Sequence, residues 1–462
     1  MKRSVYTTVS RPTSLPRRLV DSAVLTTVGL VLVSTWHIQP FVVFGPSMAE
    51  TLVGEHHRLT CDDCGYTFVC GADRPTMAGK QAICPNCGAT AGRIDLAPCL
   101  PADAVLVDRS AFVFRQPRRW DLATFRGNGP KSEIYVKRVV GLPGETVELR
   151  HGDVYADGVV QRKNLAQQRA MATLVHDNSH TAPSLASRWL PETADSGWRQ
   201  AGARFWRAAT SGKSDDETID WLSYHHRRRR PGEPDIADEL PVSDDCGYNQ
   251  TLPVTQSHLV RDLMVRCRMR VADAPTAIWL LTDGVSQFLV ELDFTQSQAK
   301  VTQDGRRLGA TSWPTTKAAE SVLIELALCD EQVLLGLDGQ EVLRLAWIPA
   351  DLPLRPTSRP IAVGTRGNSL EIWDLVVLRD LYYGPGHLQA PAEHQYLLAD
   401  DEYFVLGDNS PDSLDSRNWP QPGIAMRNFI GKPLLAYPAG LRSNGPTGRF
   451  QVPDLGRFRY IH

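Results

Sequence analysis

Residues 135–149 read YVKRVVGLPGETVEL, two apolar runs separated by a cluster of turn-forming residues. The cluster Gly141-Leu142-Pro143-Gly144 is a tight-turn signal, so the stretch predicts two neighbouring strands of a β-sheet. Lys137 is a charged residue in a strand that is otherwise apolar. Because successive side chains of a strand point to opposite faces, Lys137 and Arg138 point in opposite directions, and we expect at least one of them to turn toward the core.

A lysine surrounded by apolar atoms loses hydration, which disfavours its charged form and lowers its pKa. The neutral amine can then act as a base near pH 7. The alternative for Lys137 is a surface position, with the stem lying along the sheet and the head group in water. The lysine alone does not decide between these two.

Two further segments contain side chains that could work with such a base. Upstream, Gly45-Pro46-Ser47-Met48 places a serine after a Gly-Pro corner. A serine hydroxyl is a poor nucleophile unless a base takes its proton, and a serine in such a corner, taken alone, is more often a turn residue. Downstream, GDNSPDSLDSR at 407–417 follows the apolar run 403–406. That loop could supply hydroxyl and carboxylate partners that orient a base, or it could be a turn-rich surface loop.

Taken together, these segments resemble the conserved boxes of type I signal peptidases, which pair a catalytic serine with a lysine. GPSMAETL resembles the nucleophile box GxSMxPTL, YVKRVVGLPGETVEL resembles the lysine box, and GDNSPDSLDSR resembles the closing box, GDN followed by SxDSR. DAVLVDR at 103–109 and the strand around 120–125 resemble the segment between them. The resemblance covers roughly residues 15–60, 100–162 and 396–440.

The resemblance implies a role for each matching position. Ser47 would be the nucleophile that forms an acyl-enzyme, and Lys137 the general base. Ser413 would hydrogen-bond to Lys137 and orient it, and Asp415 and Arg417 would form a structural ion pair near the site. No cofactor is implied for catalysis.

The residues around the serine would support it. The backbone N–H of Ser47 would be an oxyanion donor, with Gly45 and Met48 as its supporting neighbours. Gly45 occupies a position where some members place a serine that adds a second donor, and glycine occurs there in others. Glu50 stands where the family usually has proline, which leaves the course of the loop after Ser47 open.

The implied function is a membrane-bound serine endopeptidase that removes N-terminal signal peptides from secreted precursor proteins. The substrate would carry small residues at the first and third positions before the cut and would bind as an added strand at a sheet edge. One alternative is a catalytically decayed, membrane-tethered binding protein. Another is a Ser/His/Asp hydrolase that uses His56, His57 or His394, although none of these lies in a recognisable motif.

The N-terminal region is expected to anchor the chain in a lipid bilayer. Residues 1–21 are basic, and the apolar run that follows, extended to residue 44, reaches the roughly 20 residues that span a membrane. The basic flank would stay in the cytoplasm, which places the catalytic domain on the outer or periplasmic face of the cell membrane. The alternative is a cleaved signal peptide.

Paired cysteines interrupt the catalytic segments at 58–99. Two Cys-x-x-Cys pairs stand 19 residues apart, a spacing that predicts a structural zinc site of the zinc-ribbon type. The four expected ligands are Cys61, Cys64, Cys84 and Cys87. The alternative is two disulfides, and Cys70 and Cys99 are further candidates for either role.

From residue 251 onward, short alternating strands recur about every ten residues with Gly and Asp turns, which predicts a β-sandwich. Segments such as LIELALCDEQVLLGLDGQEVL resemble concanavalin-like or laminin-G-like jelly rolls, which suggests a glycan or protein ligand. We expect this domain to span 165–385, and the catalytic domain 45–164 and 386–462. Residues 227–230, four arginines, are expected to form a solvated loop.

The fold class is therefore mainly β, with an N-terminal transmembrane helix at 22–44. The formal net charge of -2 argues against a nucleic-acid-binding protein, which usually carries a basic excess.

Overall fold

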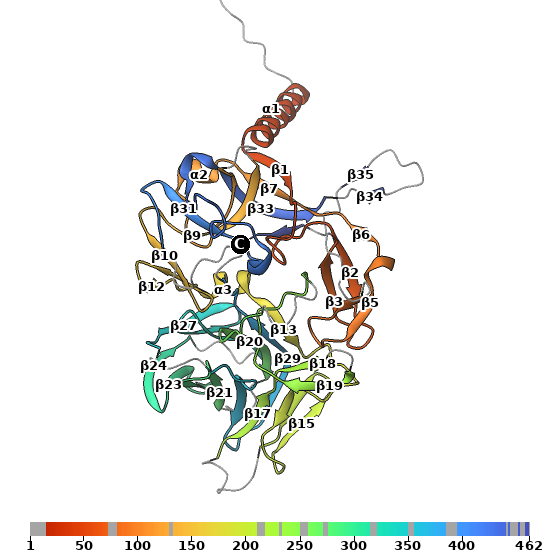
Figure 1. Ribbon diagram of the computed structural model, residues 1–462, viewed down its shortest axis with the longest axis vertical. Helices are drawn as coiled ribbons and strands as arrows, with labels where there is room; N and C mark the ends of the chain where they lie inside the picture. Colours follow the sequence, from red (N-terminus) through yellow and green to blue (C-terminus); the bar gives the residue numbers. More distant parts are fainter. Residues whose placement is uncertain are drawn as a thin grey trace, which may run out of the picture.

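The computed structural model describes residues 15–72, 81–128, 133–209, 218–230, 233–249, 257–270, 276–314, 321–349, 355–384, 395–439, 442–443, 451–452 and 458–461. The protein is mainly β, as the sequence predicts, with helix α1 extending from one end of the molecule (Figure 1). Residues 1–14 of the expected cytoplasmic segment and His394 lie outside the described residues.

Helix α1 runs from Leu15 to Trp36, shorter at its C-terminal end than the expected anchor. Residues Ile38–Val42 form strand β1 instead of continuing the helix toward Phe44. Pro40 explains this difference, because proline removes an amide donor and disfavours helical backbone in the residue before it. Within the described residues, no helix combines the length and the apolar character needed to cross a membrane.

The first sheet carries the three segments singled out in the sequence. Its strands follow the order β1-β7-β33-β8-β9-β31-β32, with β36 paired to β33 (Figure 1). Their bounds are β7 Asp103–Asp108, β8 Leu122–Arg126, β9 Ile134–Gly141, β31 Glu402–Leu406, β32 Ile424–Ala425, β33 Phe429–Pro438 and β36 Arg459–Tyr460. The sheet is therefore built from both ends of the chain.

A second sheet of order β12-β11-β10-β30 continues from the predicted tight turn. Its strands are β10 Thr146–Arg150, β11 Asp153–Ala156, β12 Val159–Val160 and β30 Gln395–Leu397. Asp157 and Gly158 join β11 to β12 with φ of 51° and 77°. An Asp-Gly pair favours a two-residue hairpin turn, and two successive positive φ values are those of such a turn.

The cysteine-rich segment forms two small sheets on one side of the molecule (Figure 1). The three-stranded one has the order β3-β2-β6, and the other is a hairpin of β4 and β5. The strands are β2 His56–Thr60, β3 Thr67–Gly71, β4 Gln81–Ile83, β5 Thr90–Arg93 and β6 Cys99–Leu100. The short helix α2, Ala111–Phe114, follows β7 in the first sheet.

Two large antiparallel sheets form the predicted sandwich. One has the order β15-β16-β29-β20-β25-β26-β27 with β13 paired to β29, and the other β14-β17-β28-β21-β22-β23-β24. One hydrophobic cluster takes side chains from both. The strands of the first are β13 Thr173–Asp177, β15 Trp198–Ala201, β16 Arg204–Arg207, β20 Leu263–Arg270, β25 Ser321–Cys329, β26 Gln332–Leu337, β27 Gln340–Ala346 and β29 Leu370–Arg379. Those of the second are β14 Trp189–Pro191, β17 Asp220–Tyr224, β21 Thr276–Thr282, β22 Gln287–Asp293, β23 Gln298–Gln303, β24 Arg306–Ser312 and β28 Ile361–Thr365.

The four arginines expected in a loop form strand β18, Arg227–Arg230, paired to β19, Glu233–Glu239. Arg230 makes an ion pair with Asp238 at 2.7 Å. The acidic residues of β19 thus supply the opposite charges across the hairpin, which stabilise the paired strands.

A cluster of buried ion pairs joins the beginning and the end of the sandwich. Lys163, just before helix α3 (Leu165–Met171), makes buried ion pairs with Asp330 at 2.5 Å and with Asp380 at 2.8 Å. Asp380 directly follows β29, the last strand of the sandwich. The sandwich is therefore held to the rest of the chain by a buried charge cluster.

Candidate active site

Ser47 lies in a loop that follows β1, and both ends of this loop bind the same residue of the sheet. Val43 N donates to the Asp103 carbonyl oxygen at 2.8 Å, and Val53 N donates to an Asp103 carboxylate oxygen at 3.0 Å. Both ends of the loop are therefore fixed to one residue of β7. The Met48 side chain is buried in a cluster with Val105 and neighbouring apolar residues, which holds the loop down next to the serine.

The backbone around Ser47 leaves its hydroxyl and its N–H available. Gly45 has φ of +83°, a conformation that favours glycine. In the described part of the chain, no hydrogen bond is recorded to the Ser47 hydroxyl or to its N–H. The Glu50 side chain, at the position where proline is usual in the family, is exposed.

Lys137 is almost completely buried in β9, with 1% of its surface exposed. Its Nζ donates a hydrogen bond of 3.1 Å to Ser413 Oγ. The register of the sheet explains this contact, because Leu406, the last residue of β31, lies opposite Arg138. The loop after β31 therefore begins beside Lys137.

The surroundings of Lys137 favour the neutral amine. Burial lowers its pKa to about 8, because Asp415 and other nearby carboxylates offset the loss of hydration only in part. Lys163 is equally buried, but its two carboxylate partners outweigh burial and raise its pKa well above the ordinary value. No carboxylate lies within ion-pair distance of Lys137 in the described part of the chain. The two lysines therefore differ in charge preference because of their partners.

Arg138, on the opposite face of β9, is also buried. It donates to both oxygens of Asp408, at 2.8 and 2.6 Å, and to the Trp120 carbonyl at 2.9 Å. Thr51, from the serine loop, donates to the same carboxylate at 2.5 Å. The strand is covered on both faces, since Val139 and Val140 belong to different hydrophobic clusters.

The Arg138–Asp408 pair joins all three sequence segments, and it was not among the predicted site residues. The signal was present: a second cation in a buried strand, and an acid at the start of the closing box.

The loop that begins at Gly407 contacts the serine loop directly. Asn409 donates from its backbone N–H to the Ser47 carbonyl at 3.1 Å, and from its side chain to the Pro46 carbonyl at 3.0 Å. A Cβ at position 407 would lie 2.2 Å from Ser413 Oγ and 2.4 Å from the Ser47 carbonyl oxygen. Only glycine therefore permits this close approach of the two loops.

Asp415 and Arg417 form a buried ion pair behind the loop, with Arg417 Nη2 2.7 Å from Asp415 Oδ2. Asp415 also accepts the Gly407 N–H at 3.0 Å. Burial acts to raise the pKa of Asp415, but the charge of Arg417 outweighs it and leaves the pKa below its ordinary value. This pair fixes the backbone from which Ser413 projects.

The sandwich reaches the serine loop through a segment near residue 248. Asn249 and Asn409 exchange side-chain hydrogen bonds of 2.6 Å. Tyr248 packs against Ala49 and Val53, and its hydroxyl donates to a backbone carbonyl of the segment that follows them. No motif in the sequence predicts this contact.

The structure thus brings the Ser47 loop, Lys137, Ser413 and the Asp415–Arg417 pair to one place. In the described residues the amine is bonded to Ser413, and no hydrogen bond is recorded between Ser47 and Lys137. The hydroxyl and N–H of Ser47 are available, and the loop that bonds to the Ser47 carbonyl also holds a buried amine of lowered pKa. Nucleophilic attack assisted by a base needs these two kinds of group. His56 and His57 each hydrogen-bond to a backbone carbonyl and are not recorded in contact with Ser47.

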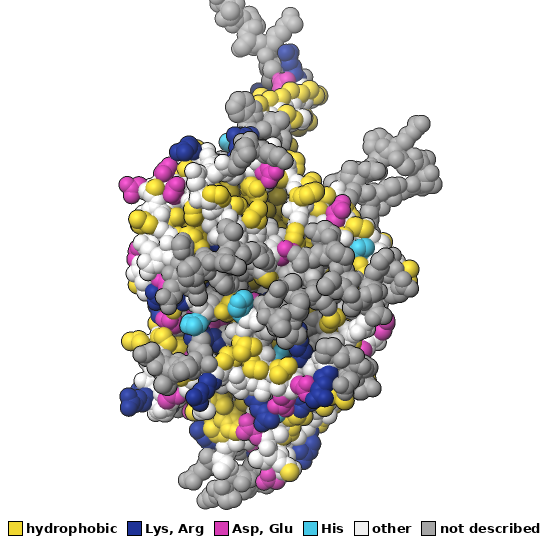
Figure 2. Space-filling model, in the orientation of Figure 1, with side chains coloured by type: hydrophobic (Ala, Val, Ile, Leu, Met, Phe, Trp, Pro, Cys, Tyr) yellow, Lys and Arg dark blue, Asp and Glu magenta, His cyan; other side chains and the backbone are white. Residues whose placement is uncertain are grey.

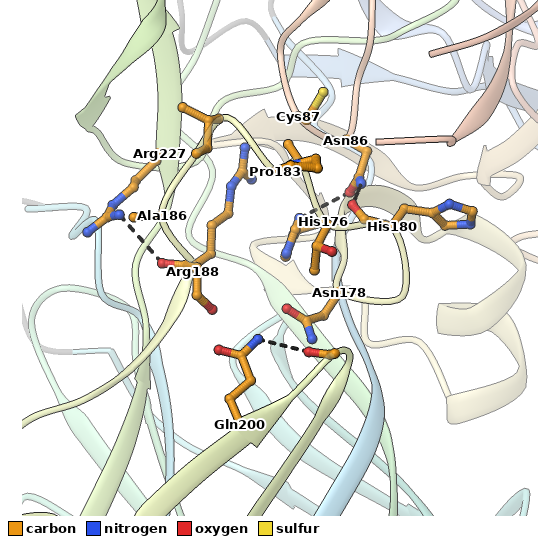
Figure 3. Close-up of a pocket in the computed structure, with 15 residues that line it drawn as sticks. Asn86, Cys87, His176, Asn178, His180, Pro183, Ala186, Arg188, Gln200 and Arg227 are labelled. Carbon is orange, nitrogen blue, oxygen red and sulfur yellow. Dashed lines mark hydrogen bonds between the residues drawn. The ribbon is translucent and has the colours of Figure 1, made fainter. Parts of the chain in front are cut away.

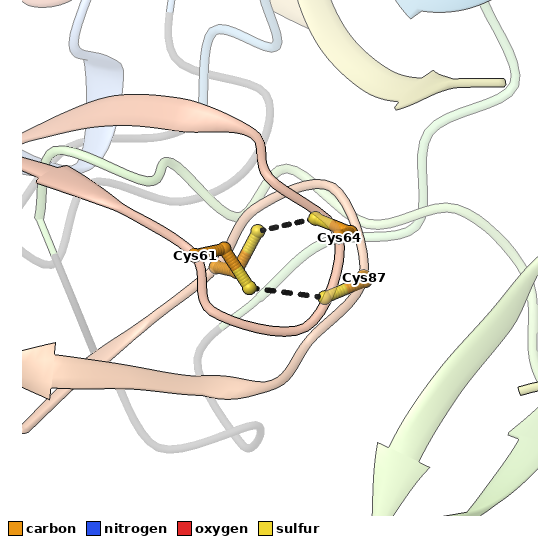
Figure 4. A group of neighbouring side chains, drawn as sticks. Cys61, Cys64 and Cys87 are labelled. Atoms are coloured by element: carbon orange, nitrogen blue, oxygen red, sulfur yellow. Dashed lines mark hydrogen bonds between the residues drawn. The ribbon is translucent and has the colours of Figure 1, made fainter. Parts of the chain in front are cut away.

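The two cysteine pairs come together in a buried cluster (Figure 4). The four sulfurs lie within 4.8 Å of one another. Across the two pairs, the sulfur of Cys61 lies 3.6 Å from that of Cys87, and the sulfur of Cys64 lies 3.6 Å from that of Cys84. These separations are far longer than the roughly 2.05 Å of a disulfide bond. They approach the roughly 3.8 Å expected between thiolates that surround zinc at about 2.3 Å in a tetrahedron. The four cysteines therefore fit a site in which four thiolates bind one metal ion.

The turns that present the cysteines are alike. Gly65 and Gly88 have φ of 71° and 75°, and each donates its N–H to the carbonyl of the first cysteine of its pair. Cys70 and Cys99 lie outside the cluster, opposite His57 on the two strands that flank β2. Two strand spacings therefore separate them, which is too far for a disulfide.

Comparisons with known proteins agree with the sequence motifs. The family described as "Signal peptidase, peptidase S26" matches residues 17–194 and 382–437, just over half of the chain. A signal peptidase I of Leptolyngbya laminosa is 35% identical over 72 residues, which is 14% of this chain and 36% of that protein. Signal peptidase I V of Bacillus subtilis is 35% identical over 54 residues, 12% of this chain and 31% of that protein. The chain thus spans about a third of the length of these curated relatives.

Among solved structures, a carbohydrate-binding module, CBM66 of Bacillus subtilis, is 10% identical, covers 42% of this chain and 93% of its own, and has a TM-score of 0.23. A score of this size does not establish a common fold.

Proposed function

The chain belongs to the signal peptidase family, peptidase S26, and from this membership and the geometry around Ser47 we propose that it is a signal peptidase I that works with a serine and a lysine. One observation carries the proposal. The buried Lys137, whose pKa is lowered, donates a hydrogen bond to Ser413. The loop that carries Ser413 also donates hydrogen bonds to the backbone carbonyls of Pro46 and Ser47.

In the proposed mechanism, neutral Lys137 removes the proton from Ser47 Oγ as that oxygen attacks the scissile carbonyl carbon. The C–N bond then breaks, and the ammonium of Lys137 protonates the leaving amine. Next, Lys137 takes a proton from water, which attacks the ester carbon. The ester C–O bond breaks, and Ser47 recovers its proton.

The free N–H of Ser47 would donate to the oxyanion in both steps. Gly45 supplies no hydroxyl as a second donor, so the site would work with fewer donors than members that have serine there. Met48 and the Asp415–Arg417 pair would act only through the positions of the two loops.

The substrates are proposed to be precursor proteins that carry N-terminal signal peptides, bound as an added strand at a sheet edge. The N-terminal region, residues 1–44, is proposed to attach the enzyme to the cell membrane, with the basic N-terminus inside and the catalytic sheet outside. Large apolar side chains are exposed along α1, which stands out from the body of the protein (Figure 2). Further exposed apolar side chains lie after β1, at Phe44, and on α2, at Val113 and Phe114.

We further propose that Cys61, Cys64, Cys84 and Cys87 hold a structural zinc ion, which leaves no open position for catalysis. The sandwich is proposed to dock a glycan or a protein partner. It would also support the serine loop through Asn249.

Cleavage of a secretory precursor by the full chain in detergent tests the function. We expect wild type to cleave and Ser47→Ala and Lys137→Ala to lose nearly all activity. Lys300→Ala, which changes an exposed lysine on strand β23, should behave like wild type. Activity in Lys137→Ala would exclude the lysine base. An inactive wild type on several precursors would favour the alternative, a membrane-tethered binding protein.

A further inference from the structure

A cavity of about 380 Å³ lies where the second cysteine turn meets the sandwich (Figure 3). Its lining is rich in polar side chains, among them Asn86, His176, Asn178, Arg188 and Gln200. Asn86 joins the two parts, because it accepts the Asp177 N–H at 2.7 Å and donates to the His180 carbonyl at 2.8 Å. None of the residues that line the cavity belongs to the Ser47 site, so the cavity is separate from catalysis.

Arg188 is the unusual member of this lining. Only 7% of the residue is exposed, and Figure 3 shows its side chain extending among the other lining residues, between Arg227 and His176. Its recorded side-chain hydrogen bond is a long one, 3.4 Å to the Tyr224 hydroxyl. No carboxylate lies within 4.0 Å of its guanidinium in the described part of the chain. A buried charge without an opposite charge or a full set of hydrogen bonds costs stability.

Other buried arginines in the described residues are fully partnered. Arg138, Arg207 and Arg417 each pair with a carboxylate at 2.6 or 2.7 Å. Arg379 donates to three backbone carbonyls at 2.9 to 3.0 Å. Arg188 therefore departs from the rule that the rest of this protein follows.

The groups that face Arg188 do not supply the missing negative charge. Arg227, also in the lining, is a second cation and makes its ion pair with Glu239 at 3.4 Å. Burial, and then the charge of Arg188, lower the pKa of His226 to about 3, so this ring stays neutral. Cys87, one of the four proposed zinc ligands, also lines the cavity, but no contact joins it to Arg188 among the described residues. Arg188 is thus a cation without a carboxylate partner in a lining of amide and hydroxyl groups.

We propose that this cavity binds a small ligand that carries a carboxylate or a phosphate group, with the Arg188 guanidinium as its main partner. A guanidinium presents a planar pair of N–H donors that matches the two oxygens of such an anion. The surrounding amides and hydroxyls suit a hydroxylated ligand of about the size of a monosaccharide. The site lies at the junction of the cysteine segment and the sandwich, so the ligand would contact both.

Calorimetric titration of the full chain in detergent tests this proposal with three probes: D-glucuronate, inorganic phosphate and D-glucose. Glucose has the shape of glucuronate but no carboxylate. We expect glucuronate, phosphate or both to bind and glucose not to bind. The anion that binds more tightly shows whether the ligand carries a carboxylate or a phosphate group. Arg188→Met should weaken anion binding at least tenfold, and Arg188→Lys, which keeps the charge but not the planar pair, should give an intermediate value.

Arg204→Met is the matched control, because Arg204 is an exposed arginine of the same sandwich. It should bind the anion as wild type does. The proposal is overturned if wild type binds neither anion, or binds glucose equally well. It is also overturned if Arg188→Met binds as tightly as wild type. If wild type binds no anion and Arg188→Met loses zinc, the proposal is also overturned, and Arg188 balances the charge of the cysteine thiolates instead. If Arg188→Met does not fold, the wild-type and Arg188→Lys titrations decide.

Discussion

Lys137 Nζ lies 3.1 Å from Ser413 Oγ, although 276 residues separate the two in the chain. The pairing of β9 with β31 brings them together, because it starts the loop after β31 beside the lysine. The partner of the amine is a neutral hydroxyl and not a carboxylate. A hydroxyl stabilises the ammonium less than a carboxylate does, so burial prevails and the pKa falls.

The pH dependence of cleavage should follow the protonation of Lys137. Only the neutral amine can take the Ser47 proton, so kcat/KM should rise with pH and level off above an apparent pKa near 8. Lys137→Arg, which stays charged over this range, should be inactive at every pH. A pH series with one precursor gives the profile. A flat profile from about pH 6 to pH 10 would contradict the lysine base.

Replacing the two buried lysines should change stability in opposite directions. The pKa of Lys137 falls from 10.5 to about 8 on folding, so the unfolded chain binds more protons, and stability decreases as the pH falls through this window. Lys137→Met should therefore raise the free energy of unfolding at pH 7 by on the order of 1–3 kcal/mol. Lys163→Met leaves Asp330 and Asp380 without their cation and should lower it by about 3–5 kcal/mol. Urea unfolding measures both changes in the free energy of unfolding. If the two variants change it in the same direction, the opposite charge preferences of Lys137 and Lys163 are refuted.

Gly407→Ala should abolish most activity without unfolding the protein. The added Cβ would lie 2.2 Å from Ser413 Oγ and 2.4 Å from the Ser47 carbonyl, so the two loops must separate. We expect kcat to fall at least a hundredfold, since misplacement of reacting groups by about 1 Å can cost that much. Gly29→Ala is the control, because that glycine lies in helix α1 with open space around it. Normal cleavage by Gly407→Ala would show that the loops are not held as described.

Asn249→Ala tests the contact between the sandwich and the serine loop. Loss of the two 2.6 Å bonds to Asn409 frees the side chain that binds Pro46. We expect kcat to fall about tenfold with little change in KM, because a tenfold change corresponds to the net free energy of about one buried hydrogen bond. Asn428→Ala removes a comparable but exposed bond to Asn128 and should have no effect. Equal rates in the two variants would assign Asn249 no part in positioning the loop.

Metal analysis tests the cysteine cluster. One zinc per chain is expected in wild type and in Cys99→Ser, which changes an exposed cysteine outside the cluster. The double change Cys61→Ser with Cys64→Ser should lose the metal and lower the unfolding temperature, because metal binding stabilises such small segments. Zinc retained by the double variant would exclude this ligand set.

Much of the fold could be predicted from the sequence because its signals are local. The turn at 141–144, the hairpin turn at Asp157-Gly158 and the alternating strands of the sandwich all depend on neighbouring residues. The contacts that join distant parts could not be predicted in this way. Asn249 with Asn409 depends on how the sandwich docks. The arginine strand β18 depends on the acidic strand that follows it.

The route of the chain through the first sheet has a consequence for the order of synthesis. Ser47 and Lys137 leave the ribosome early, whereas β31 and the Gly407 loop emerge only after the whole sandwich. A nascent chain therefore carries the proposed nucleophile and base without the segment that contacts both of them. In the proposed enzyme, cleavage would therefore begin only after residues 402–417 have been translated and have folded back beside β9.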